Sequence, residues 1–274
     1  MDIEVSRRIT ATRGMLDDKV ALITGSTSGI GLGVARSFAS AGASVVLNGF
    51  GNSQEINDTL EGLQRATGSR VAYSAADMAR PDEIADMVNL AIETFGRLDI
   101  VVNNAGIFHV GPIDQVPVEK WNAVLGINLS SAFHTIRLAL PAMRQQGGGR
   151  IINIASALAL VGAPLTSAYA AAKHGIVGLT KVVALETAED NITCNALCPG
   201  NVWTPLAEAH IAEQVKTHGL PREQVIRNIL LAEQPNKRFA VVEEIGAFAT
   251  FLASDAAASI TGAALPVDGG WTAH

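Results

Sequence analysis

The sequence predicts an α/β fold: a single-domain, doubly wound Rossmann fold whose seven-stranded, mostly parallel sheet is flanked by helices. Short apolar runs of strand length alternate with longer segments of helical periodicity along the chain. Strands that are apolar throughout are typical of a parallel sheet covered on both faces. A glycine-rich turn at 25–31 lies between the first strand and the first helix, the place where such folds bind phosphate groups.

Each strand is expected at an apolar run bounded by turn or charged residues. The seven expected strands are 19–25, 44–48, 70–76, 98–106 (ending in a loop), 150–156, 191–200 and 264–268. Helical periodicity and favourable first-turn residues place the helices between them. They are expected at about 30–41, 53–65, from Pro81 onward, 118–144 with a bend near Pro141, 166–188 and 242–252.

Two segments stand apart from this alternation. Residues 1–15 are expected to form a flexible N-terminal extension before a single domain, 16–274, and a start at Met15 fits the sequence equally well. Residues 201–238 are expected to be irregular, because they are polar and contain three prolines. The sequence shows no linker that would divide the rest into two domains.

Charge and composition exclude several classes of protein. The chain has 274 residues, with 20 Lys and Arg against 26 Asp and Glu, hence a formal net charge of −6. This balance argues against nucleic-acid binding, and 48% hydrophobic residues exclude a disordered chain. No apolar run approaches the ~20 residues that span a bilayer, and no secretory signal is recognised. We therefore expect a cytoplasmic protein with no membrane partner.

The cysteines and histidines indicate neither a disulfide nor a metal site. Cys194 and Cys198 lie four residues apart in one expected strand, so that about 13 Å would separate their Cα atoms, too far for a disulfide. The six histidines show no paired ligand spacing. Both thiols are expected to be buried and reduced, as in the cytoplasm.

The turn after the first strand reads TGSTSGIG over residues 24–31. Glycines allow a tight turn and let backbone N–H groups approach a pyrophosphate at the helix N-terminus. The spacing G-x-x-x-G-x-G resembles the glycine loop of the short-chain dehydrogenase/reductase family. Further marks of that family follow in order over about residues 16–271: the run 103–106 (NNAG), Asn128, Ser156, Tyr169-x-x-x-Lys173 and Pro199-Gly200.

The resemblance implies a catalytic set of Asn128, Ser156, Tyr169 and Lys173. Tyr169 and Lys173 are four residues apart and share one helix face, where an ammonium would lower the pKa of the tyrosine toward the working range. By resemblance, Ser156 binds the reacting oxygen, Tyr169 exchanges the proton, Lys173 binds the nicotinamide ribose and Asn128 supports a water relay. The implied reaction interconverts an alcohol and a ketone without a metal.

The resemblance also implies a nicotinamide cofactor in a dinucleotide-binding and catalytic domain. NAD is expected rather than NADP, because neither the glycine loop nor the run 48–51 carries a cation for a 2′-phosphate. The matching cofactor-binding residues are Gly25, Thr27, Ser28, Gly29, Ile30, Gly31, Phe50, Asp77, Met78, Asn104, Ala105, Gly106, Tyr169, Lys173, Pro199, Gly200, Val202 and Thr204.

Several stretches resemble NAD-dependent 3-hydroxybutyrate dehydrogenases in particular, among them VLNGFG and VPVEKWNA. The positions that bind the carboxylate in those enzymes are changed here, to Phe108, Leu158, Thr166 and His210. Without a matching cation a buried carboxylate costs several kcal/mol, so Phe108, Leu158 and Trp203 predict an apolar or aromatic-lined pocket, with His210 also at the pocket. The expected substrate is an uncharged, moderately hydrophobic secondary alcohol or ketone, held under a substrate loop at about 201–238.

Two other functions stay open. One is a true 3-hydroxybutyrate dehydrogenase that anchors its carboxylate through His210 or Thr166. The other, from a different class, is a non-catalytic nucleotide-binding sensor, which the complete Ser156, Tyr169 and Lys173 set disfavours. The family is commonly tetrameric, and the apolar helices expected at 118–144 and 166–188 favour a homotetramer.

Overall fold

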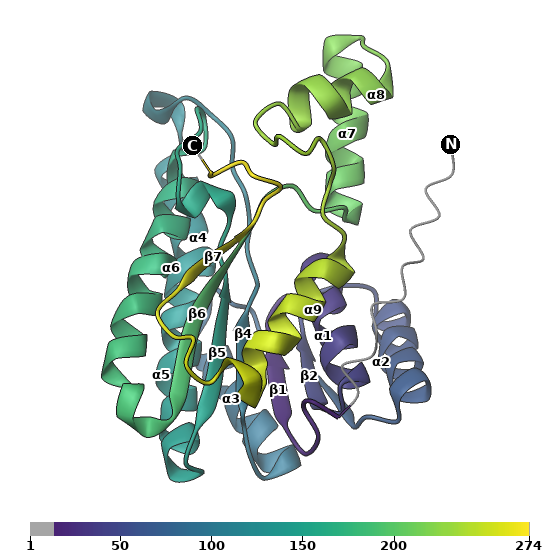
Figure 1. Ribbon diagram of the computed structural model, residues 1–274. Coiled ribbons are helices and arrows are strands. Elements are labelled where there is room, and N and C mark those ends of the chain that lie inside the picture. The colour runs from purple at the N-terminus through teal and green to yellow at the C-terminus, as the bar shows by residue number, and fades with distance from the viewer. Residues whose placement is uncertain (1–13, 274) are drawn as a thin grey trace.

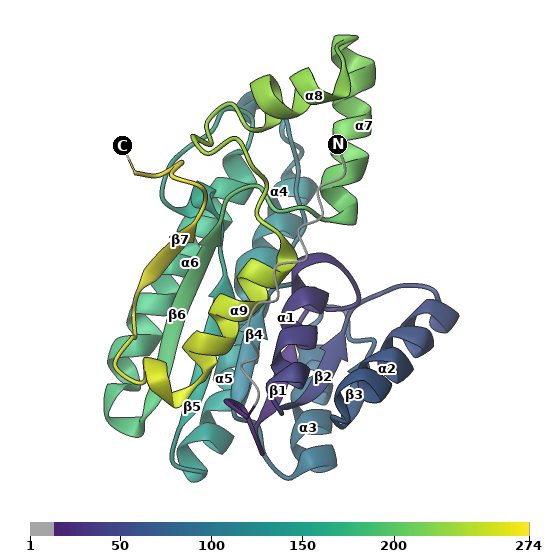
Figure 2. The same cartoon turned by 45° about the vertical axis from the view of Figure 1, so that its right-hand side comes forward.

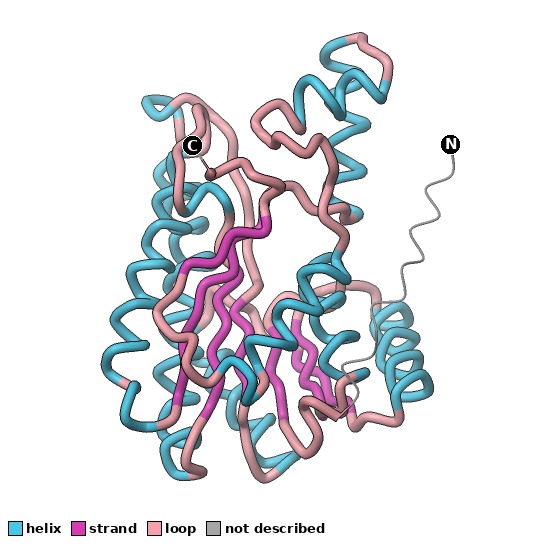
Figure 3. Tube along the Cα trace, in the orientation of Figure 1, coloured by secondary structure: helices cyan, strands magenta, loops and turns pink. Residues whose placement is uncertain are grey.

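The computed structural model describes residues 14–273, which form one seven-stranded sheet with helices on both faces (Figure 1). The strand order is β3-β2-β1-β4-β5-β6-β7, and every neighbouring pair is parallel (Figure 3). The predicted fold class is confirmed, and the sheet is parallel throughout. The strands are β1 (Val20–Ile23), β2 (Ser44–Asn48), β3 (Val71–Ser74), β4 (Ile100–Asn103), β5 (Gly149–Ile154), β6 (Ile192–Pro199) and β7 (Ala264–Val267).

Helices α1, α2 and α9 pack on one face of the sheet, and α3, α5 and α6 pack on the other (Figure 2). Capping signals set where several of them begin: Asn52 accepts the N–H groups of Gln54 and Glu55 at the start of α2. The helices are α1 (Gly29–Ser40), α2 (Ser53–Thr67), α3 (Pro81–Phe95), α4 (Val118–Leu125), α5 (Ser131–Gln145), α6 (Ser167–Glu186), α7 (Pro205–His218), α8 (Arg222–Val225) and α9 (Val242–Ala253).

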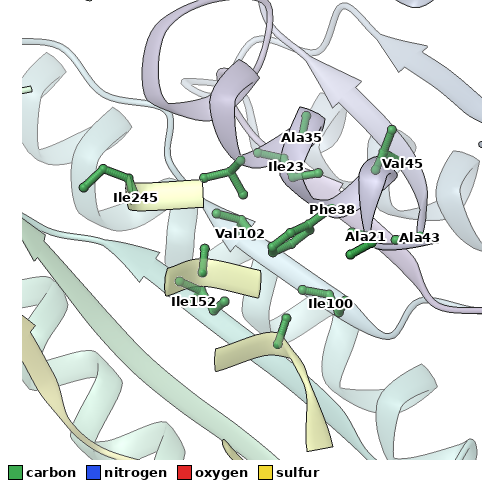
Figure 4. Close-up of a cluster of buried hydrophobic side chains, with 14 of the residues drawn as sticks. Ala21, Ile23, Ala35, Phe38, Ala43, Val45, Ile100, Val102, Ile152 and Ile245 are labelled. Atoms are coloured by element: carbon green, nitrogen blue, oxygen red, sulfur yellow. The ribbon is translucent and has the colours of Figure 1, made fainter. Parts of the chain in front are cut away.

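The apolar side chains of the strands form the core that holds α1 and α9 on the sheet (Figure 4). Phe38 of α1 is fully buried in the same cluster as Ile23, Val102 and Ile245. Removing such a ring costs roughly 3–5 kcal/mol, so this layer fixes α1 firmly. The N-terminus of α1 is thereby held at the carboxyl end of β1.

The strand order reverses at β1, whose neighbours are β2 and β4. Ile23 pairs with Leu47 of β2 and with Val102 of β4, so the three strands end at nearly the same level. In open α/β sheets, ligands bind outside the carboxyl ends of the strands at such a reversal. The loops that follow β1, β2 and β4 therefore lie at the expected binding edge.

The long helix expected at 118–144 contains an irregularity that the sequence did not reveal. It consists of α4, a π-helical turn at Gly126–Ser130, and α5. The departure from α-helical geometry lies at this turn rather than near Pro141, which α5 accommodates. A π-turn inserts one extra residue, which apolar periodicity does not show, and such turns are frequent at functional sites. Asn128 lies at its centre.

The prediction that residues 201–238 are irregular is wrong. The segment contains α7, α8 and a π-helical turn at Ile226–Leu230. Its first two prolines do not interrupt helices: Pro205 is the first residue of α7, and Pro221 immediately precedes α8. Proline is favourable at a helix start because no backbone N–H is needed there. Thr204 caps α7 by accepting the N–H of Ala207 at 3.2 Å.

One helix of the described residues, Val118–Gln145, is long and apolar enough to cross a membrane by length and composition alone. Ile136, Ala139 and Met143 of this helix are buried against the sheet, as in the core helix of a globular domain. The expected N-terminal extension at 1–15 lies outside the described residues, apart from its last two.

Candidate active site

The glycine turn between β1 and α1 has a conformation that needs glycine. Gly25 and Gly29 have φ angles of +61° and +56°, in the left-handed region that other residues rarely adopt. A Cβ on Gly25 would lie 2.9 Å from the Cα of Ala105, and a Cβ on Gly31 would overlap the carbonyl oxygen of Gly25. The glycines therefore permit both the turn and its close packing against the loop after β4.

Helix α1 begins after this turn without a side-chain cap. Ser28 is the N-cap residue, and its hydroxyl makes no capping hydrogen bond. The first N–H groups of a 12-residue helix, together with its dipole, then form a site for an anion. The phosphate-binding residues expected from the sequence, including Thr27 and Ile30, lie together at this helix start. The site fits the pyrophosphate of a dinucleotide.

The loop after β4 holds the glycine turn in place. The amide of Asn104 donates to the carbonyl oxygens of Thr24 and Gly25 at 2.8 and 2.9 Å. The backbone N–H groups of Asn104 and Ala105 donate to the Thr24 hydroxyl at 2.9 and 3.0 Å. Gly106 follows, where a Cβ would lie 3.4 Å from the Asn128 side chain. These residues, which the resemblance assigned to the cofactor, also connect the glycine turn to the catalytic side.

The loop after β2 lies where the adenosine end of a dinucleotide is expected. Hydroxyl groups hold two of its carbonyls: Tyr73 donates to Gly49 at 2.7 Å, and Thr27 donates to Phe50 at 3.0 Å. The Phe50 ring is 67% exposed and free to pack against a flat base. Asp77 follows β3 and accepts the N–H of Ala79, with the buried Met78 beside it.

The expected catalytic side chains lie just beyond β5 and on α6. Ser156 lies just beyond β5, and its hydroxyl accepts the N–H of Leu158 at 3.1 Å. On α6 the Lys173 ammonium lies 5.6 Å from the centre of the Tyr169 ring and donates to the carbonyl oxygen of Ile154 at 2.7 Å. The sheet edge and one helix face thus bring together the three residues that the sequence singled out.

Burial is the main cause of the pKa shifts of Tyr169 and Lys173. Burial raises the pKa of Tyr169 above its ordinary value of 10.0, and the hydrogen bond with Ser156 opposes that shift. Burial also lowers the pKa of Lys173 to about 8. In the protein alone the net shift of the tyrosine is therefore upward, the opposite of the lowering expected from the lysine by itself.

Asn128 forms hydrogen bonds with the backbone of the loop that follows β4. Its side-chain oxygen accepts the N–H of Ile107 at 2.8 Å, and its amide donates to the carbonyl of Ile107 at 2.9 Å. This buried pair of bonds fixes the backbone directly before Phe108. The structure therefore gives Asn128 a positioning contact in addition to the water relay that the resemblance implies.

The expected substrate-pocket residues separate into two groups. The Phe108 ring meets Tyr169 edge-on, with centroids 4.7 Å apart, and the buried Leu158 directly follows the Ser156 turn. Trp203 instead packs against Phe239 and lies 5.7 Å from the Arg222 guanidinium. His210 is exposed on α7. Only the first group lies at the catalytic side chains.

The residues after β6 reach back to the glycine turn. Pro199 ends β6, and the N–H of Gly200 donates to Val267 at 3.0 Å. Val202 pairs with Ala240 in an isolated bridge. Thr204 then approaches the phosphate turn, because a Cβ on Gly29 would lie 3.7 Å from its methyl group.

Sequence reasoning missed Asn48 and Gln234. Asn48 was considered only for its lack of charge, yet its buried side chain accepts the N–H of Gly25 at 3.1 Å and donates to Ser74 and Ala76 at 3.2 and 2.9 Å. Gln234 is buried and accepts the N–H of Asn201 at 3.1 Å, which ties the segment after β6 to the chain before α9. The Asn-Gly pair that ends β2 is a sequence signal for Asn48, whereas nothing in the sequence marks Gln234.

Among residues 14–273, no group of three or more His, Cys, Asp or Glu side chains is placed to hold a metal ion. Cys194 and Cys198 are buried and free. Burial raises their pKa values to about 12 and about 11, so both are protonated thiols at neutral pH.

A family model described as Enoyl-(Acyl carrier protein) reductase matches residues 25–272, nearly the whole described structure. The chain belongs to the short-chain dehydrogenase/reductase family. It is therefore an oxidoreductase, and the reaction class expected from Ser156, Tyr169 and Lys173 is confirmed at the level of the family.

Individual relatives of this short-chain dehydrogenase/reductase differ in their named substrates. Two D-beta-hydroxybutyrate dehydrogenases are similar to it. That of Rhizobium meliloti is 53% identical over 256 residues, which cover 93% of this chain and 99% of the relative. That of Cupriavidus necator is 51% identical over 260 residues, which cover 95% of this chain and 100% of the relative. A cyclohexanol dehydrogenase from Acinetobacter sp. is 38% identical over 260 residues, which cover 93% of this chain and 96% of the relative. The structure of L-sorbose reductase from Gluconobacter frateurii, complexed with NADPH and L-sorbose, has a TM-score of 0.91 at 33% identity and covers 97% of this chain and 100% of its own.

Proposed function

We propose that this oxidoreductase uses NAD to interconvert a secondary alcohol and a ketone that is uncharged and moderately hydrophobic. The observation that carries the proposal is the Phe108 ring, which lies edge-on against Tyr169 with centroids 4.7 Å apart. The buried Leu158 follows Ser156 in the chain, and its backbone N–H donates to the Ser156 hydroxyl. A carboxylate placed against these apolar groups would lose hydration without gaining a charged partner, at a cost of several kcal/mol.

The side chains divide the proton chemistry between them. The Ser156 hydroxyl accepts the N–H of Leu158, which leaves its own proton to donate to the substrate oxygen. Tyr169 takes the hydroxyl proton during oxidation and returns it during reduction. Lys173 uses one donor on Ile154, and its other protons remain available to the nicotinamide ribose and the tyrosine oxygen. A bound nicotinamide supplies the hydride acceptor.

The preference for NAD rests on the loop after β2. The run 48–51 and the glycine turn 24–31 contain no Lys or Arg. The Asn48 side chain is fully engaged with the backbone at Gly25 and after β3, so it leaves no donor for a 2′-phosphate. A phosphate without a cationic partner is poorly held. We expect kcat/KM for NAD to exceed that for NADP by at least about 10-fold, which corresponds to about 1.4 kcal/mol.

Oxidation of 3-hydroxybutyrate is the second candidate. The two relatives that are 51–53% identical carry that activity in their names, whereas the relative at 38% identity is named for a neutral alcohol. Against the second candidate, the hydroxyl of the buried Thr166 donates to the carbonyl of Ala163 at 2.8 Å, and His210 is exposed on α7. Neither side chain is poised in this structure to receive a carboxylate at Tyr169. A sensor without catalysis is disfavoured by the complete catalytic set.

The test is a panel of secondary alcohols and hydroxy acids, with NAD and NADP, followed by the absorbance of the reduced cofactor. We expect 1-phenylethanol and cyclohexanol to be oxidised with a higher kcat/KM than 3-hydroxybutyrate. Strong, selective oxidation of 3-hydroxybutyrate would replace our proposal with the second candidate. Efficient turnover with NADP alone would overturn the cofactor assignment.

We further propose that the enzyme is a cytoplasmic homotetramer without nucleic-acid or membrane partners. Large apolar side chains stay exposed on α5 and α6, among them Phe133, Val182 and Leu185. Exposed apolar surface of this kind favours burial between subunits. The acidic net charge and the two reduced cysteines support the remaining parts of the proposal.

A further inference from the structure

Large apolar side chains are exposed on two loops near Tyr169, one after β4 and one before α6. On the loop after β4, Phe108 is 48% exposed, Val110 54% and Ile113 77%. Leu165, on the loop before α6, is 49% exposed. We call these four side chains the apolar rim. Loops at the ligand-binding edge of a sheet are usually polar, and contiguous apolar surface on them indicates a binding site.

The two loops that carry the rim are joined to each other, and Phe108 on one of them contacts Tyr169. The N–H of Gly111 donates to the carbonyl of Leu165 at 3.0 Å and joins the two loops. Phe108 contacts Tyr169 directly, and Asn128 holds the backbone of Ile107 with two hydrogen bonds. Phe108 is therefore held against the tyrosine ring, and the loop that carries Leu165 is joined to the loop that carries Phe108.

Leu165 is the least expected member of the rim. Its φ angle is +66°, in the left-handed region that costs a residue with a Cβ free energy. Within residues 14–273, the other non-glycine residues with positive φ are Asp18, Asn191 and Lys237, all of them polar. Glycine or asparagine at position 165 would avoid both the strain and the exposed apolar surface. Backbone strain of this kind clusters at ligand sites.

We propose that the apolar rim binds an apolar extension of the substrate, so that the enzyme acts on secondary alcohols and ketones with a tail of several carbons beyond the reacting carbon. This inference rests on the proposed function. Phe108 is the rim side chain that contacts Tyr169, so a short substrate at the tyrosine meets Phe108 first. A longer apolar tail is needed to bury the rest of the rim, and its burial supplies binding free energy.

The test is the series of 2-alkanols from 2-butanol to 2-decanol with NAD. Because burial of one methylene is worth a factor of about 4, kcat/KM is expected to rise about 3- to 4-fold per carbon and to level off once the rim is covered. Leu165→Gly is compatible with the backbone and is expected to fold with an unchanged or higher Tm. It should lower kcat/KM by a factor that grows with chain length. Val110→Ser should act in the same direction without altering a strained position.

Met15→Ala is the matched control, because Met15 is also an exposed apolar side chain but precedes β1 at the opposite end of the sheet. It should leave the slope of kcat/KM against chain length unchanged. A flat slope in the unmodified enzyme, with 2-butanol still oxidised, would overturn the tail site and leave the proposed function standing. An equal loss at every chain length in Leu165→Gly would show a positioning role and overturn it too. Failure to oxidise any alcohol would overturn the proposed function itself.

Discussion

At the scale of single residues, the proposed reaction depends on Tyr169, and burial disfavours the ionised form of its hydroxyl. Lys173 is the cation beside it, 5.6 Å from the ring centre. Because Tyr169 is the proposed acid and base, Tyr169→Phe is expected to lower kcat by at least about 100-fold. Affinity for NAD, measured by calorimetry, should persist, since the glycine turn and the loop after β2 are untouched. Near-normal turnover by this variant would exclude the assignment.

The same residue sets the expected pH dependence. Burial holds the pKa of Tyr169 above 10.0 in the protein alone, and oxidation needs the deprotonated form. The rate of alcohol oxidation should therefore rise with pH between about 7 and 9, while ketone reduction, which uses the protonated form, should stay nearly constant. Lys173→Met removes the cation and should move the rising limb to higher pH. A profile of kcat/KM for oxidation that is flat over this range would contradict the role of the tyrosine.

The candidate catalytic residues could be predicted from the sequence because the family resemblance rests on local, motif-like spacing. Tyr169 and Lys173 share a helix face, and Ser156 ends a recognisable apolar strand. The contacts of Asn48 could not be read in the same way, because they join residues 23 to 28 positions away. Nor could the strained backbone of Leu165, since leucine carries no preference for that conformation.

At the scale of elements, Asn48 joins β2, the glycine turn and the end of β3. Asn48→Ala leaves Gly25, Ser74 and Ala76 with unpaired buried backbone groups, each worth about 1–3 kcal/mol. We expect the free energy of unfolding to fall by at least about 2 kcal/mol and KM for NAD to rise, with a smaller effect on kcat. Urea titration and steady-state kinetics measure both. Asn122→Ala, an exposed position on α4, is the control, and equal effects of the two variants would contradict the account.

Elements with strong apolar runs or clear periodicity were predicted well, and those between residues 201 and 238 were not. All seven strands and the main helices lie close to their expected positions. The prolines and polar residues of the 201–238 segment predict an irregular chain, whereas Pro205 and Pro221 stand at helix starts. Its helices bury Ile211 and Leu231 in a small cluster of their own, which is too sparse to produce a clear periodic pattern.

At the scale of the whole molecule, the exposed apolar side chains of α5 and α6 predict association. We expect analytical ultracentrifugation to give the mass of a tetramer. Leu185 is 81% exposed on α6, and Leu185→Asp should shift the distribution toward smaller species, because a carboxylate would be buried at the contact. Met15→Asp, at an exposed apolar site outside these helices, should not. A stable monomer of the unmodified protein would refute the prediction.

We propose that an apolar pocket sets the substrate of this short-chain dehydrogenase/reductase. The most direct measurement is the ratio of kcat/KM for 3-hydroxybutyrate to that for 1-phenylethanol, in the unmodified enzyme and in the variant that combines Phe108→Gln, Leu158→His and Thr166→Lys. We predict a ratio below one in the unmodified enzyme and a rise of at least about 10-fold in the variant, because an ammonium and two donors would then face the carboxylate. A ratio well above one in the unmodified enzyme, unchanged or lowered by the three substitutions, would contradict the claim.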